Sequence, residues 1–228
     1  MRRRRDRLEH LAERAGDSRL EARIRSYELA ARMQLSAPEV LDLSKEPQHM
    51  LDLYGINTKN TDDKGPMNPG EEIRYFGRNC LVARRLLERG VRFVQLMHSG
   101  WDQHSNLHTQ FAVQCKDTDA PSAALVRDLK ERGLLESTLV FWGGEFGRTP
   151  FGQGDPAKPA GRDHFGRAYA MWLAGGGVRG GTTFGETDDF GWNITKDAVH
   201  VHDMQATLLH LLGINHERLT FRYQGRQF

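Results

Sequence analysis

The run VRFVQLM, at residues 91–97, constrains the fold of this 228-residue chain most strongly, because its β-branched and aromatic residues have the length of a buried strand. A second run of this kind, TLVFWGG, occupies 138–144. Between the two, a helix is predicted over about 121–132, beginning at Pro121 and ending at Gly133. Strand, helix and strand in this order form a βαβ unit, which favours a parallel sheet.

Further apolar runs continue the pattern towards the C-terminus. AYAMWLAGGG at 168–177 predicts a third strand, and VRGGTTFG at 178–185 indicates a fourth. A last helix is expected to be capped by Asp203 and to stop at Gly213. Residues 91–228 are therefore predicted to form an α/β core in which helices flank a mostly parallel sheet.

Residues 1–90 are predicted to form a helical N-terminal region of the same domain. One helix is expected to end near Leu35 and another to begin at Ser36, where SAPE has the form of a capping box. A long loop is expected at 57–72, which is rich in Asn, Asp, Gly and Pro. One apolar face of a further helix up to Gly90 is made by Ile73, Phe76, Cys80, Ala83 and Leu87.

The charge balance argues against nucleic acid as a partner. The chain has 32 Lys and Arg against 30 Asp and Glu, whereas phosphate-driven binding needs positive charge clustered on one face. The basic start, MRRRRDRLEH, is interrupted by Asp6 and Glu9 and lacks the apolar stretch of a signal peptide or twin-arginine leader. No apolar stretch approaches the roughly 18 residues of a membrane span. We therefore expect no targeting signal in this sequence, no membrane span and a cytoplasmic location.

The two cysteines, Cys80 and Cys115, are too few for a disulfide scaffold and lack metal-type CxxC spacing. Both are interpreted as buried thiols.

Polar residues gather where the predicted strands end, which is where ligands bind in parallel α/β sheets. The first cluster follows the run at 91–97 and contains His98, Asp102, His104 and His108. Asp102 and His104 share a face if this loop is extended, and we interpret them as metal ligands. Asp102 could instead be a simple turn residue, while His98 could cap a strand and His108 could face water.

The second cluster is GGEFGRTP at 143–150. Glu145 follows a predicted buried strand and is flanked by glycines, so packing gives no reason for an acidic residue there. Arg148 could bind an oxyanion through its guanidinium group or could form an ordinary ion pair.

The third cluster, GRDHFGR, precedes the run at 168. Its adjacent residues Asp163 and His164 point in opposite directions if the loop is extended, so only one of them is expected to be a ligand. We favour His164, with Asp163 as an orienting partner or a ligand. His202, in VHVHD, is interpreted mostly as structural.

A divalent metal ion is the cofactor that these residue types suggest. Asp, Glu and His together suit Zn²⁺ or Mn²⁺ better than Ca²⁺ or Mg²⁺. Such ions act as Lewis acids on phosphoryl-type oxygens. The candidate ligands are Asp102, His104, Glu145 and His164, with Arg148 and Asp163 as candidates for catalytic roles.

Four motifs in order resemble those of the DUF1501 proteins, a family of largely uncharacterised bacterial proteins related to the sulfatase and alkaline phosphatase superfamily. They are GWDQHSN, GGEFGRTP, GRDHFGRAYAMWLAGGGVRGG and VHVHDMQATLLHLLGI, and the resemblance covers about residues 18–228. It implies an alkaline phosphatase/sulfatase-like fold and a metal-dependent hydrolase that acts on phosphate or sulfate esters of small molecules or polysaccharides.

The resemblance also places individual residues. Asp102 and His104 resemble the earlier Asp and His ligands, although their spacing differs from Asp-x-x-x-His, and His164 resembles the late histidine ligand. Glu145 takes the place of the aspartate in an Asp-His metal pair, but Phe146 replaces the histidine of that pair.

Members of the family are longer, and their N-terminal part, often led by a twin-arginine signal, contains the first strand, with a metal-binding aspartate and the nucleophile in the superfamily. We therefore expect this chain to be truncated, and to be exported if such a leader lies upstream. CLVAR at Cys80 lacks the proline of the sulfatase Cys-x-Pro-x-Arg motif, so Cys80 is rejected as a nucleophile. Hydrolysis would then use metal-activated water or a nucleophile from the missing segment. The alternatives are a non-catalytic metal- or anion-binding surface protein, and a non-functional truncation.

Overall fold

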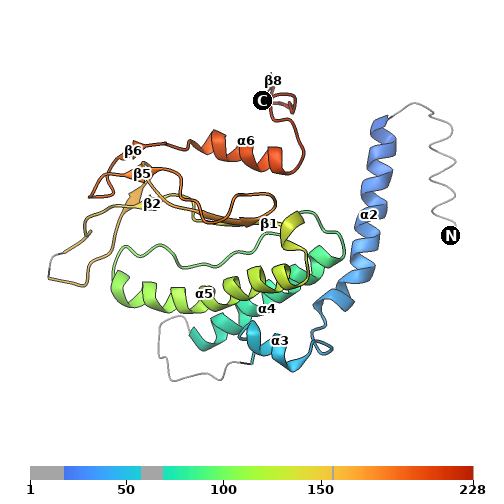
Figure 1. Cartoon of the computed structure of the whole chain (residues 1–228), viewed down its shortest axis with the longest axis horizontal. Helices are drawn as coiled ribbons and strands as arrows, with labels where there is room; N and C mark the ends of the chain where they lie inside the picture. Colours follow the sequence, from blue (N-terminus) through green and yellow to red (C-terminus); the bar gives the residue numbers. More distant parts are fainter. Residues whose placement is uncertain (1–17, 58–68, 156, 228) are drawn as a thin grey trace.

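The computed structural model describes residues 18–57, 69–155 and 157–227, and it combines helices with small antiparallel sheets. Figure 1 shows α4 and α5 side by side, a layer of short strands beyond α5, and α6 on the far side of these strands. The elements in chain order are α2 (Ser18–Leu41), α3 (Gln48–Leu53), α4 (Pro69–Glu88), α5 (Leu107–Glu131), the 3-10 turn η1 (Leu135–Ser137), β1 (Leu139–Trp142), β2 (Gly147–Arg148), β3 (His164–Phe165), β4 (Trp172–Gly175), β5 (Glu186–Thr187), β6 (Ile194–Lys196), α6 (Val201–Leu211), β7 (Arg222–Tyr223) and β8 (Arg226–Gln227).

The core lies between α3, α4 and α5. The predicted apolar face of α4 is confirmed, because Phe76, Cys80 and Ala83 are buried, and α4 ends two residues before Gly90. The core residues are Leu43, Met50, Tyr54, Phe76, Cys80, Leu81, Ala124, Leu125 and Leu129. Burial of these side chains removes apolar surface from water and joins the helices into one layer.

Charged groups are buried in the same layer. The Arg84 side chain, 3% exposed, pairs with Glu46 at 2.9 Å, with Asp128 at 3.0 Å and with Glu88 at 2.8 Å. The hydroxyl of Tyr54 donates to Asp128 at 2.9 Å. Burial raises the pKa of Tyr54, as does the Asp128 carboxylate, so this phenol stays protonated as the donor.

The helix boundaries differ from the prediction in two places. α2 runs continuously through Leu35 and Ser36 with Pro38 inside it, so the expected break between two helices is not present. α5 begins at Leu107 instead of Pro121, and Pro121 is buried inside the helix. A proline costs a helix one hydrogen bond but does not always end it, and here Pro121 is buried close to Gly77 of α4. Of the expected loop at 57–72, residues 58–68 lie outside the described residues, and α4 takes up its last four residues.

The prediction of a mostly parallel sheet is not met in the described ranges, where every ladder is two-stranded and antiparallel. β1 pairs with β4, with Leu139 opposite Gly175 and Trp142 opposite Trp172. The run at 91–97 has no regular secondary structure and joins no ladder, so the predicted βαβ unit is absent there. An apolar run indicates burial, but it does not identify its hydrogen-bonding partner.

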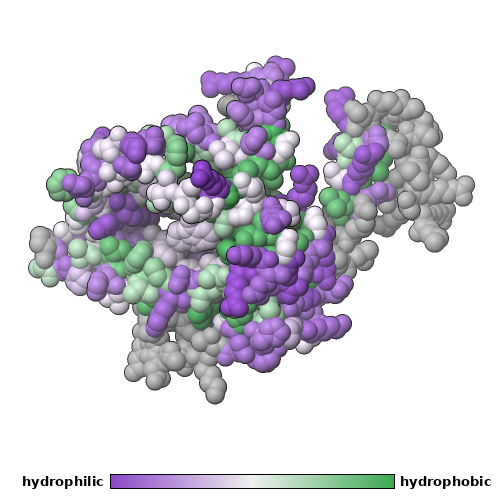
Figure 2. All heavy atoms as spheres, in the orientation of Figure 1, coloured by the Kyte–Doolittle hydropathy of each residue, from purple (hydrophilic) through white to green (hydrophobic). Residues whose placement is uncertain are grey.

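Large apolar side chains remain on the surface around these strands. Phe93 is 77% exposed and Met97 79%, whereas Leu96 between them packs against the helical core. Phe141, Trp142 and Trp172 of β1 and β4 are also exposed. Figure 2 shows hydrophobic residues at the surface among hydrophilic ones.

The C-terminal predictions hold for the third strand, found as β4 within 168–177, and for the last helix, but not for the fourth strand. Residues 178–185 form a turn and irregular chain instead of a strand, and β5 begins at Glu186. α6 has His200 as its N-cap, not Asp203, because the His200 side chain accepts from the His202 amide while Asp203 accepts from the His200 amide. Among the described helices, none is long and apolar enough to cross a membrane.

Candidate metal centre

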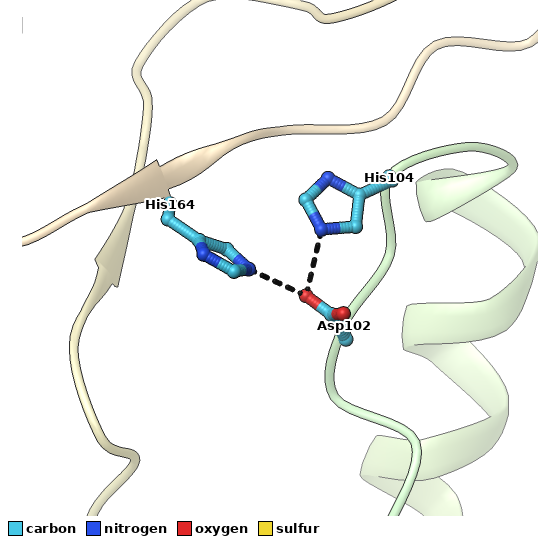
Figure 3. Close-up of side chains that lie close together, drawn as sticks. All are labelled: Asp102, His104 and His164. Carbon is cyan, nitrogen blue, oxygen red and sulfur yellow. Dashed lines mark hydrogen bonds and ion pairs between the residues drawn. The ribbon is translucent and has the colours of Figure 1, made fainter.

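Three side chains converge on one point at the surface. Oδ1 of Asp102 lies 3.0 Å from Nε2 of His104 and 3.0 Å from Nε2 of His164 (Figure 3). One potential ligand atom from each residue lies within 4.8 Å of the other two. The three side chains are 58%, 39% and 50% exposed, so solvent and small molecules reach them.

Two segments far apart in the sequence provide this cluster. Asp102 and His104 lie in the irregular segment just before α5, and His164 opens β3. Backbone hydrogen bonds fasten the second segment to the first: Asn106 donates to Pro159 at 3.2 Å, Leu107 to Ala160 at 3.2 Å, and Arg162 to Gln103 at 2.9 Å. The pairing of β2 with β3 then sets Arg148 directly opposite His164.

Gly161 allows the two segments to approach closely. A Cβ atom at Gly161 would lie 2.0 Å from the carbonyl carbon of His104, a separation that real contacts do not permit. Gly147 in β2 likewise allows a close approach to the segment after β3, because a Cβ there would lie 2.0 Å from the carbonyl oxygen of Ala168. The glycines around the site therefore allow close contact between backbones.

Arg148 connects the cluster to Glu145. Its Nη1 donates to Oδ1 of Asp102 at 2.6 Å, and its Nη2 donates to Oε1 of Glu145 at 3.1 Å. Glu145 thus lies beside Arg148, outside the group formed by Asp102, His104 and His164. As a metal ligand Glu145 remains a prediction, and it would have to leave this ion pair to act as one.

These neighbours keep Asp102 ionised. The hydrogen bond from Arg148 has the largest effect, followed by that of His164, and together they lower the pKa of Asp102 to about 2. A carboxylate that is ionised across the physiological pH range is suited to holding a cation.

Asp163 lies next to both histidines of the cluster. Its Oδ1 accepts from the His164 backbone amide at 2.8 Å and lies 3.9 Å from Nδ1 of His104. The backbone amide of Asp163 donates to Oγ1 of Thr149 at 3.1 Å, and the Thr149 amide donates to the Asp163 carbonyl at 2.9 Å. Asp163 thus contacts the backbone of His164, and its role in orienting this residue stays a prediction.

Gln153 is a residue of the site that the sequence did not reveal. Its Oε1 lies 2.7 Å from Nδ1 of His104, on the opposite side of the ring from Asp102. In the sequence Gln153 lies directly between Gly152 and Gly154. Flanking glycines are also the signal that identifies Glu145 as a candidate, so the same signal could have identified Gln153.

The remaining histidines considered as ligands lie elsewhere. Nδ1 of His98 accepts from the Trp101 indole at 3.0 Å, and His108 is exposed on α5. His200 and His202 belong to the N-terminal cap of α6. Cys80 is buried in the helical core, and this burial raises the pKa of its thiol to about 12.

The donor set can accommodate a divalent ion. Tetrahedral zinc ligands at about 2.1 Å from the metal lie about 3.4 Å apart. The Asp102 contacts of 3.0 Å therefore need to lengthen only slightly to admit an ion. Two imidazole nitrogens and one carboxylate oxygen suit Zn²⁺ or Mn²⁺, and three protein ligands leave a coordination position open, as in catalytic zinc sites.

Comparison with known proteins gives one match. The model of a family described as "Protein of unknown function (DUF1501)" matches residues 1–228. No curated protein matches the chain, and no solved structure does.

Proposed function

We propose that this chain, which belongs to the DUF1501 family, is a metal-dependent, hydrolase-like protein that acts on phosphate or sulfate esters. The observation that carries the proposal is the convergence of Asp102, His104 and His164 through atoms 3.0 Å apart. The relationship to the sulfatase and alkaline phosphatase superfamily is part of the same proposal. It rests on the order of the sequence motifs, not on the sheet topology.

Asp102, His104 and His164 would hold the ion. Zn²⁺ or Mn²⁺ is proposed in preference to Ca²⁺ or Mg²⁺, because two of the three donors are imidazole nitrogens and the hard cations prefer oxygen. When bound, such an ion would supply Lewis acidity towards a phosphoryl or sulfuryl oxygen. The exposure of the cluster supports a substrate that approaches from solvent, either a small ester or an ester group on a polysaccharide.

Arg148 would bind the ester oxygens that carry negative charge. Its guanidinium already spans Asp102 and Glu145, so it lies at the edge of the proposed metal site. A guanidinium presents several N–H donors in one plane and can contact a phosphate or sulfate while keeping one of these partners. Asp163 would hold the backbone of His164 through the hydrogen bond to its amide.

Turnover tests the proposal. Metal-free protein is loaded with Zn²⁺ or Mn²⁺ and assayed with an aryl phosphate and an aryl sulfate. We expect hydrolysis that depends on the metal and is lost in Asp102→Ala and His164→Ala but kept in His108→Ala, which changes an exposed histidine outside the cluster. Turnover that persists in both cluster variants would overturn the proposed role of this site.

A second function, binding without turnover, is favoured by one observation. The Asp102 carboxylate and the Nη1 and Nη2 atoms of Arg148 already have hydrogen-bond partners within the protein, which a substrate would have to displace in part. Metal binding with no hydrolysis of either ester would favour this function.

A further inference from the structure

We infer that Gln153 is a positioning residue for the proposed metal site: its side-chain carbonyl holds the His104 ring so that Nε2 presents a lone pair to the ion. The inference rests on the proposed function and adds a residue that the sequence motifs did not identify. The distances that carry it are 2.7 Å from Oε1 of Gln153 to Nδ1 of His104 and 3.0 Å from Nε2 of His104 to Oδ1 of Asp102.

The neighbours of Nδ1 determine where the ring carries its hydrogen. An amide oxygen is an acceptor only, so Nδ1 has to donate to Gln153. The second polar atom near Nδ1 is Oδ1 of Asp163 at 3.9 Å, and a carboxylate oxygen is also an acceptor. Both neighbours therefore favour a hydrogen on Nδ1.

A hydrogen on Nδ1 leaves Nε2 of the neutral ring with its lone pair directed at Asp102. A lone pair and a carboxylate oxygen repel each other at 3.0 Å unless a positive centre lies between them. A divalent ion at this position would be held by Nε2 and Oδ1 together. Outer hydrogen bonds of this kind fix the orientation of metal-binding histidines and the nitrogen that they present.

The backbone around Gln153 is held in place, so the side chain has a defined origin. The Gln153 amide donates to the Gly161 carbonyl at 2.8 Å, and the Gly161 amide donates back to the Gln153 carbonyl at 3.4 Å. Gly161 in turn packs directly on the backbone of His104. Gln153 and His104 are therefore connected through both backbone and side chain.

Substitutions at Gln153 separate acceptor chemistry from shape. Gln153→Met has similar size but cannot accept from Nδ1, so we expect Zn²⁺ and Mn²⁺ affinity to fall by about 10–100-fold. Gln153→Glu can only accept, so its affinity should stay within a few-fold of the wild type. Gln205→Met changes an exposed glutamine on α6 and should have no effect. Affinities are measured by competition with a chromophoric chelator.

A second readout does not require the metal. Nitrogen-15 NMR of the histidine rings in metal-free protein reports which ring nitrogen of His104 carries hydrogen. We expect the Nδ1–H form in the wild type and in Gln153→Glu, and a shift towards the Nε2–H form in Gln153→Met. A change at residue 153 that merely loosened the structure would shift the ring in Gln153→Glu as well, so a shift confined to Gln153→Met is the result that supports the contact.

The outcomes separate this inference from the proposed function. A wild type that binds no metal would overturn the proposed function, while the ring tautomer would still decide whether Gln153 acts on His104. If the wild type binds metal and Gln153→Met binds it equally well, the inference about Gln153 is overturned alone. Equal weakening in Gln153→Met and Gln153→Glu would also overturn it, since only one of them lacks the acceptor.

Discussion

Nε2 of His164 lies 3.0 Å from Oδ1 of Asp102, although the two residues are 62 positions apart in the chain. The contact depends on the hydrogen bonds that fasten residues 159–162 to residues 103–107 and on the pairing of β2 with β3. The cluster is therefore a product of tertiary structure, and changes that touch none of its side chains should alter it.

Gly161→Ala provides such a change. The added Cβ would lie 2.0 Å from the His104 carbonyl carbon. This neighbour is a backbone atom, which cannot move aside as the end of a flexible side chain can. We expect a loss of about 1–3 kcal/mol in the free energy of unfolding, together with weaker metal binding because His104 is displaced. Urea denaturation and metal titration measure the two effects.

Gly166→Ala is the matched control, because a Cβ there meets nothing within 4 Å. Its stability and metal affinity should equal or slightly exceed those of the wild type. Equal behaviour of the two variants would show that the close approach at Gly161 does not matter.

Arg148→Met should raise the pKa of Asp102 from about 2 towards its ordinary value of 3.8, since the Arg148 hydrogen bond is the largest cause of the lowering. A lowered pKa in the folded protein means that Asp102 contributes stability above about pH 3.8 and that this contribution disappears as the pH falls through about 2. In Arg148→Met this contribution should become smaller, because the folded and unfolded pKa values of Asp102 then lie closer together.

Carbon-13 NMR of the Asp102 carboxyl in metal-free protein measures this shift. Arg162→Met, which changes an exposed arginine near the site, serves as control and should leave the midpoint unchanged. An unchanged Asp102 midpoint in Arg148→Met would contradict the assigned cause.

The sequence predicted the polar cluster better than the sheet. The sequence predicts Asp102 and His104 as partners on the premise of an extended segment. The structure brings both side chains to one point, but through a turn in which the His104 amide donates to the Asp102 carbonyl at 2.9 Å. His164 was favoured over Asp163 because neighbours in an extended chain point apart, and only His164 belongs to the three-residue group.

The parts that were not predicted depend on long-range contacts. The run at 91–97 is rich in apolar residues, but its composition does not indicate that only Leu96 would pack against the helical core and that the run would join no ladder. α5 continues through Pro121, which is buried close to Gly77 of another helix, a neighbour that the local sequence does not reveal. The contact of Gln153 with His104 joins residues 49 positions apart, and no local pattern encodes it.

Arg84→Met should destabilise the helical layer strongly. It would remove the buried guanidinium that Glu46 and Asp128 share, leaving Glu46 with Arg85 and Asp128 with Arg132. Leaving a buried charge without any partner costs about 3–5 kcal/mol in the free energy of unfolding, and we expect a loss that approaches the lower end of this range. Chemical denaturation monitored by circular dichroism measures this cost.

The comparison for that variant is Arg127→Met, which breaks an exposed i,i+4 pair with Glu131. Exposed pairs contribute about 0–1 kcal/mol, so the midpoint should hardly move. If both variants lose a similar free energy of unfolding, the burial of Arg84 does not make its ion pairs more important for stability than an exposed pair.

Cys80 should resist alkylation in the folded protein. It is 1% exposed, and burial raises the pKa of its thiol to about 12, so almost no reactive thiolate forms near neutral pH. Iodoacetamide labelling followed by peptide mass spectrometry should modify Cys115, which is partly exposed, before Cys80. Rapid labelling of Cys80 without unfolding would contradict its rejection as a nucleophile.

Direct metal titration of the metal-free protein tests the central claim, that Asp102, His104 and His164 form a divalent metal site. By isothermal titration calorimetry we expect saturable binding of Zn²⁺ or Mn²⁺ to the wild type and to His108→Ala. His164→Ala should weaken it by more than the ~10–100-fold that outer partners contribute. Absence of binding in the wild type, or unchanged binding in His164→Ala, would contradict the claim.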